Sequence, residues 1–206
     1  MYVFPGGRVD ASDADPSVLA RLDHLSSATA EQRLDLRGAE PPAIAYYLAA
    51  LREAFEETGI LVAALEDGSF PPTASADAAV DRLRDELMED RIDFADVLAL
   101  LDCRVPGDRL QYFAHWITPR REPRRFDARF FAARVAANCT PIIDPREMTD
   151  ALWIAPAPAL ERHAHGDLPM ILPTVHTLER LCAFGTSEEA LGALACGTVV
   201  TILPDD

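Results

Sequence analysis

Three glutamates and an arginine at residues 52–57 are the side chains in this sequence best suited to chemistry. Arg52, Glu53, Glu56 and Glu57 are followed closely by Gly59. In a helix, which turns by about 100° per residue, the three glutamates fall within an arc of about 100°. Carboxylates so close together destabilise a helix by a few tenths of a kcal/mol per pair unless a cation lies between them. The pattern therefore indicates a site for a hard divalent cation, Mg²⁺ above all where phosphate is present. The alternative is a solvated acidic helix face.

A helix over residues 44–58 must position these groups. Its apolar residues Ile44, Leu48, Leu51 and Phe55 cluster opposite the glutamates, so that face is predicted to be buried. Gly59 is expected to close the helix. Further helices are predicted at 16–25, 76–88, 93–101, 156–163, 173–184 and 187–195, and strands at 2–4, 60–63, 110–118, 126–135, 149–154 and 198–203. Because helices and strands mix without βαβ regularity, we expect an α/β fold, an α/β/α sandwich around a mixed β-sheet.

Length and charge restrict the classes of function. The 206 residues predict a single domain over 1–206. A formal net charge of −15 argues against partners such as nucleic acid or an anionic membrane surface. Four widely separated cysteines without a C-x-x-C pair indicate reduced thiols, and we expect a cytoplasmic protein.

The segment from Arg52 to Ile60 resembles the core of the Nudix hydrolase signature, R-E-U-x-E-E-x-G-U, where U is a bulky apolar residue. Ala54 is smaller than usual at the first U position. The upstream half of the signature, G-x5-E, resembles Gly7 to Asp13, with aspartate in place of glutamate. Asp13 and Arg52 are separated by 38 residues where the signature has seven, which predicts a helical insertion over approximately residues 14–44. Asp13, one methylene shorter than glutamate, is expected to serve as little more than a loop cap.

An insertion at this point is similar to the long-insert Nudix subgroup that contains the peroxisomal coenzyme A diphosphatases. Further segments resemble that subgroup: residues 115–119, 125–127, 152–156 and 197–204. The resemblance implies a hydrolase that uses Mg²⁺ or Mn²⁺ to cleave the diphosphate of a nucleoside diphosphate linked to another moiety. Coenzyme A or acyl-coenzyme A is the favoured substrate, and NADH and ADP-ribose are alternatives. The competing class is a Nudix-fold module that binds a nucleotide or a partner without hydrolysing it.

The resemblance also assigns roles to single residues. It implies that Glu56 and Glu57 bind the metal, and that Glu53 either joins them or acts as the general base. Arg52 is expected to orient a glutamate, and Gly7 to supply the backbone conformation close to the metal and the substrate.

Other candidate site residues lie further along the chain. Glu147 is a candidate extra base or acidic ligand, the alternative being a solvated loop glutamate. Arg124 and Arg125 could bind a substrate phosphate, and an ordinary solvated surface loop is the alternative.

Nudix domains usually have one or two strands before the Phe4-Pro5-Gly6-Gly7 segment, whereas this chain starts there. Either Met1 is an internal methionine and N-terminal strands are missing, or the insertion or a second copy, as in a homodimer, covers an open sheet edge.

Overall fold

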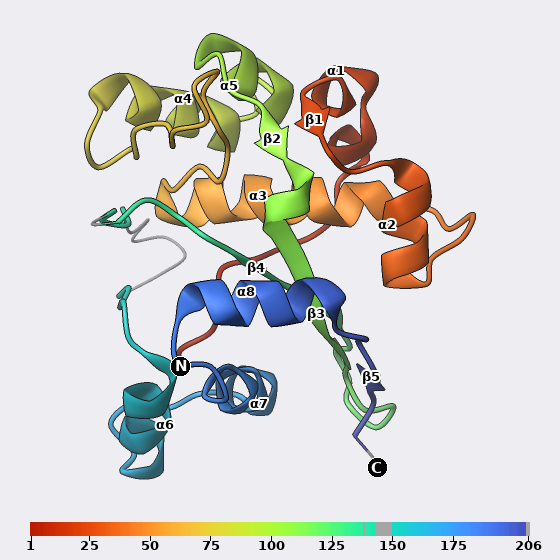
Figure 1. Ribbon diagram of the computed structural model, residues 1–206, viewed down its shortest axis with the longest axis vertical. Coiled ribbons are helices and arrows are strands. Elements are labelled where there is room, and N and C mark those ends of the chain that lie inside the picture. The colour runs from red at the N-terminus through yellow and green to blue at the C-terminus, as the bar shows by residue number, and fades with distance from the viewer. Residues whose placement is uncertain (138, 143–149, 205–206) are drawn as a thin grey trace. The chain divides into compact units, whose positions relative to one another are not determined.

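The computed structural model describes residues 1–137, 139–142 and 150–204, which form a mixture of helices and short strands (Figure 1). The chain divides into two compact units. Unit 1 comprises residues 1–4, 111–132 and 152–206, and unit 2 comprises residues 5–110 and 133–151. The mixed α/β content agrees with the predicted fold class. Among the described residues, none of the helices combines the length and the apolar composition that crossing a bilayer requires.

Unit 2 contains the helix that carries the glutamates, α3 (Ala43–Thr58). Its bounds agree with the predicted helix, and its apolar residues Ile44, Leu48, Leu51 and Phe55 are buried as expected. The helix ends at Gly59, whose φ of 69° lies in the left-handed region that glycine adopts without strain. Burial of the apolar stripe fixes the rotation of α3, and with it the direction of the glutamates.

Two further helices of unit 2, α4 (Ala78–Met88) and α5 (Phe94–Leu100), confirm the helices predicted there. α4 packs against both α3 and α5. Each helix begins at an aspartate that caps it: Asp77 accepts a hydrogen bond from the backbone of Ala79, and Asp93 accepts one from the backbone of Asp96.

The predicted insertion contains two short helices, α1 (Pro16–Leu19) and α2 (Ser27–Leu34), separated by the strand β1 (Leu22–Asp23). The 3-10 helix η1 (Ala11–Ala14) leads into it. The prediction of one helix over 16–25 is wrong, because β1 instead pairs in parallel with β2 (Val105–Pro106), which precedes η2 (Gly107–Arg109). Arg104 reinforces this pairing with two hydrogen bonds to the Asp23 carboxylate, at 2.6 and 2.7 Å. α2 packs against α3, so the insertion supports the helix that carries the glutamates.

Unit 1 contains a three-stranded sheet in the order β4-β3-β5, with β5 (Thr201–Ile202) parallel to β3 (Leu110–Ile117). β3 and β4 (Asp127–Ala133) confirm two predicted strands. The predicted helices are present as α6 (Pro156–Ala164), α7 (Leu172–Leu181) and α8 (Ser187–Cys196). Leu194 of α8 packs in a buried cluster with Phe113 and Trp116 of β3.

Several predicted strands are wrong or shorter than expected. Residues 60–63 are buried in part but form no strand, and residues 2–4 contribute a single bridge, from Tyr2 to Met170. Residues 150–154 form no strand, and Thr149 lies outside the described residues. Of these segments only residues 60–63 are largely buried, so burial of an apolar run did not require ladder pairing there.

Candidate functional site

Arg52 is the centre of a buried network at the C-terminal half of α3. Its Nε and Nη2 donate hydrogen bonds to the two carboxylate oxygens of Asp13, at 2.8 and 3.0 Å. Its Nη1 donates to Glu53 Oε1 at 3.1 Å and to both oxygens of Glu56 at 3.1 and 3.2 Å. The guanidinium is 7% exposed, and these contacts are those of an arginine that holds carboxylates in place.

Asp13 contributes more to this network than the loop cap expected from the sequence. It caps η1 by accepting a hydrogen bond from the backbone N–H of Asp10 at 2.8 Å, and its side chain is only 1% exposed. The same carboxylate forms the bidentate pair with Arg52. The signal in the sequence was its position, since it stands where the signature has glutamate.

The loop before η1 lies directly against two of the glutamates. The backbone N–H of Gly6 donates to Glu57 Oε2 at 3.1 Å, and the backbone N–H of Arg8 donates to the Glu53 carboxylate. A Cβ added at Gly7 would overlap the Glu53 carboxylate, so a larger residue at this position would displace that side chain. The structure thus brings Gly7 against Glu53 and its loop against Glu57, although Gly7 precedes these glutamates by 46 and 50 residues in the sequence.

Negative charge exceeds positive charge around Arg52. Four carboxylates lie within 3.4 Å of its guanidinium: Asp10, Asp13, Glu53 and Glu56. Burial raises the pKa of Glu53 and the pKa of Glu56 above their ordinary value, and the charge of Arg52 offsets this only in part. Burial alone would lower the pKa of Arg52, but the hydrogen bonds and charge of Asp13, together with Glu56 and Glu53, raise it. A further cation would relieve this imbalance.

A divalent cation fits the chemistry of these donors. Glu53, Glu56 and Glu57 offer carboxylate oxygens, the ligands that Mg²⁺ and related hard ions prefer. Within the described parts of the chain, however, no three carboxylate, imidazole or thiol groups already converge as metal ligands do. The reason is visible between Glu53 and Glu56, where Nη1 of Arg52 binds both carboxylates.

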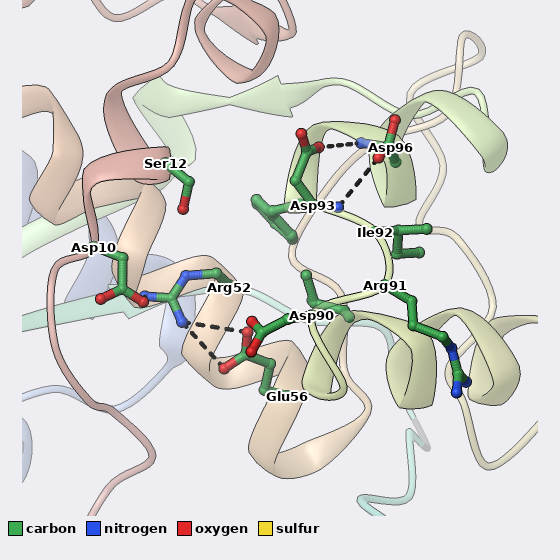
Figure 2. A pocket seen from close by; sticks show the side chains of 11 residues that line it. Asp10, Ser12, Arg52, Glu56, Asp90, Arg91, Ile92, Asp93 and Asp96 are labelled. Atoms are coloured by element: carbon green, nitrogen blue, oxygen red, sulfur yellow. Dashed lines mark hydrogen bonds and ion pairs between the residues drawn. The ribbon is translucent and has the colours of Figure 1, made fainter.

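A cleft of about 420 Å³ is lined in part by Arg52 and lies between η1, α3 and the connection from α4 to α5 (Figure 2). Arg52 and Glu56 line it together with Asp10, Asp90, Asp93 and Asp96. Its second arginine, Arg91, forms an ion pair with Glu89. The residues that line this cleft include Glu56 but not Gly7, Glu53 or Glu57, so we place the candidate site at the loop that contacts Glu53 and Glu57.

The remaining predicted site residues are Arg124, Arg125 and Glu147. Arg124 and Arg125 belong to unit 1, and both are exposed in the connection between β3 and β4. Arg124 lies over the ring of Phe126, 5.1 Å from its centroid, and Arg125 Nε donates to the carbonyl of Thr118 at 3.0 Å. Glu147 lies outside the described residues.

Comparison with known proteins identifies relatives of this chain. Residues 21–181 match the model of the family described as the NUDT19 Nudix domain. Acyl-coenzyme A diphosphatase NUDT19 from Gallus gallus is 29% identical over 218 residues, which cover 90% of this chain and 57% of the relative. The proteins of the same name from Homo sapiens and Xenopus laevis are 27% and 24% identical, covering 90% and 91% of this chain and 57% of each relative. The chain therefore spans somewhat more than half the length of these curated relatives.

A solved structure gives an independent comparison. The crystal structure of a NUDIX hydrolase from Alicyclobacillus acidocaldarius matches with a TM-score of 0.73 and 26% sequence identity, covering 95% of this chain and 82% of that one. The predicted Nudix-type fold is confirmed by this match. Because the family model covers most of the sequence, and because the network around Arg52 is built from the residues of the Nudix signature, the chain belongs to the Nudix hydrolases, in the family of the NUDT19 Nudix domain.

Proposed function

We propose that this chain hydrolyses the diphosphate bond of coenzyme A or acyl-coenzyme A with the help of Mg²⁺ or Mn²⁺. The observation that carries this proposal is the similarity, over about nine-tenths of the chain, to proteins named acyl-coenzyme A diphosphatase. The cluster of Glu53, Glu56 and Glu57 beside a glycine loop supports it, because hydrolysis of a diphosphate needs a place where negative charge is neutralised and water is positioned.

In this proposal the residues around Arg52 have different roles. Glu56 and Glu57 hold the divalent ion, which when bound neutralises phosphate oxygens and makes water more acidic. The ion pair between Arg52 and Asp13 holds η1 at a fixed distance from α3. Glu53, held by Arg52 and by the backbone of Arg8, either completes the ligand set or accepts the proton of the attacking water. Its raised pKa favours proton uptake near neutral pH more than an ordinary glutamate would.

The test is a panel of substrates assayed with Mg²⁺ and with Mn²⁺. Coenzyme A, acetyl-coenzyme A, a longer acyl-coenzyme A, NADH and ADP-ribose are compared by kcat/KM. We expect the coenzyme A compounds to be the best substrates, with cleavage within the diphosphate. Faster turnover of NADH or ADP-ribose would contradict the substrate assignment while leaving the reaction type in place.

A second candidate is a Nudix-fold module that binds a nucleotide without hydrolysing it. It is favoured by one observation: in the described residues no three potential ligands converge, and Arg52 occupies the space between Glu53 and Glu56. Calorimetry with coenzyme A separates the two candidates. Binding without turnover in either Mg²⁺ or Mn²⁺ would favour this module, whereas metal-dependent release of products would exclude it.

The proposal also covers the environment of the protein. The four cysteines are widely separated and form no C-x-x-C pair, which fits a reducing compartment such as the cytoplasm. The formal net charge of −15 favours a small-molecule substrate over nucleic acid. Sedimentation at several concentrations tests whether the protein is a homodimer.

A further inference from the structure

Arg84 is a buried arginine that the signature does not contain. It lies on α4, is 4% exposed, and its Nε donates a hydrogen bond of 2.7 Å to the backbone carbonyl of Glu56. Its Nη2 is also buried and has no hydrogen-bond partner in the part of the chain that the structure describes. A buried guanidinium with an unpaired nitrogen is unfavourable, so an apolar residue would serve better if this position only filled space.

The contact lies at the C-terminal turn of α3, where carbonyl groups lack partners within the helix. Two of these carbonyls are bound by backbone N–H groups: that of Phe55 by Gly59 and that of Thr58 by Ile142. The carbonyl of Glu56 is bound by a side chain from a different helix. Arg84 therefore ties α4 to the peptide that joins Glu56 to Glu57.

The charge of Arg84 also suits this place. The negative end of a helix dipole favours cations, yet the last turn of α3 carries Glu56 and Glu57 and contains no basic residue. Arg84 supplies from α4 the positive charge that the last turn of α3 lacks. Glu56 is thus held at two points, its carboxylate by Arg52 and its carbonyl by Arg84.

We propose that Arg84 is a positioning residue for the metal-binding glutamates: it fixes the peptide between Glu56 and Glu57 so that both carboxylates keep the direction needed to hold a divalent ion. This inference rests on the proposed function, in which these two glutamates bind the metal. It extends the site beyond the signature to α4.

The experiment measures Mn²⁺ binding by electron paramagnetic resonance, together with thermal unfolding in the absence of metal. Arg84→Met keeps the length of the side chain but removes the charge and the hydrogen bond. The matched control is Arg82→Met, because Arg82 is exposed on the same helix two residues away. We expect Arg84→Met to weaken Mn²⁺ binding about tenfold or more, and Arg82→Met to bind Mn²⁺ as the wild type does.

A purely structural role predicts a different result. In that case Arg84→Met unfolds at a lower temperature but binds Mn²⁺ with unchanged affinity, which would overturn the proposal. If Arg84→Met does not fold, Arg84→Lys is measured instead; it keeps the charge but not the geometry of Nε, and is expected to weaken Mn²⁺ binding severalfold. Wild-type affinity in that variant would also overturn the proposal. Failure of the wild-type protein to bind Mn²⁺ would overturn the metal-dependent function itself, and the role of Arg84 with it.

Discussion

Asp13 and Arg52 form a buried bidentate ion pair, at 2.8 and 3.0 Å, across the whole insertion. The exposed fractions of the two side chains are 1% and 7%. Removing Arg52 would leave the Asp13 carboxylate buried without a counter-charge, whereas removing Asp13 would leave Arg52 with Glu53 and Glu56. The pair therefore fixes the segment that follows the glycine loop against α3, however long the intervening chain is.

Asp13→Asn is expected to lower the free energy of unfolding by roughly 1.5–3 kcal/mol, because Arg52 loses the counter-charge of its most deeply buried partner while Glu53 and Glu56 still contact it. Urea unfolding measures this change. Asp10→Asn is the control, since Asp10 lies 3.4 Å from the same guanidinium but is 60% exposed. Its effect should stay below about 1 kcal/mol, as for other exposed ion pairs. Equal effects of the two substitutions would show that burial does not decide the strength of this pair.

Glu56→Gln and Glu57→Gln should each remove most diphosphatase turnover while the fold is kept. Each substitution removes a negative charge at nearly constant shape, and loss of a metal ligand is expected to raise the barrier by roughly several kcal/mol. The measurement is kcat at saturating Mg²⁺, with circular dichroism to verify folding. Glu66→Gln, at an exposed position in unit 2, is the control and should keep full activity. Normal turnover in both variants would remove Glu56 and Glu57 from the site.

Gly7→Ala is expected to reduce turnover strongly, because the new Cβ would overlap the Glu53 carboxylate and displace it. The loss should be seen in kcat at saturating substrate and metal. Gly192→Ala is the comparison, since a Cβ there meets no other atom within 4 Å. In helix α8 that change should leave turnover unchanged and raise stability slightly. If Gly7→Ala retained full activity, the close approach of the loop to Glu53 would not matter for function.

The acidity of Glu56 predicts a dependence of stability on pH. Burial raises the pKa of Glu56 in the folded protein above its ordinary value of 4.5. The protonated Glu56 carboxyl therefore stabilises the folded protein fully below that value, and this stabilisation is lost as pH rises through the raised pKa. Glu56→Gln has no such titration. Without divalent metal, the free energy of unfolding of the variant minus that of the wild type should therefore increase between about pH 4 and pH 7.

Urea unfolding of the two proteins at both pH values measures this difference. Subtracting the two proteins cancels the titration of groups that they share. A change in the opposite direction would mean that the charge of Arg52 outweighs burial at Glu56.

The sequence by itself determined the helix that carries the site. Periodicity and the closing glycine predicted α3 and its buried face, because both depend on neighbours within a few residues. The position of Glu53, Glu56 and Glu57 on one side of that helix followed from the same local geometry. Most of the other helices were predictable for the same reason. The local pattern failed where pairing between distant segments decides whether a strand forms. Residues 60–63 are apolar but form no strand, and residues 22–23 form a strand because they pair with residues 105–106.

Only the tertiary structure decided which groups surround the glutamates. The spacing of residues could not show that Asp13 would return to Arg52 after the insertion, or that Gly7 would lie against Glu53. Neither could it single out Arg84 from Arg82, the other arginine of α4, because only packing against α3 buries Arg84 beside the carbonyl of Glu56. These contacts depend on the path of the chain between distant segments, and that path is set by the burial of apolar surface in the whole unit rather than by any local pattern.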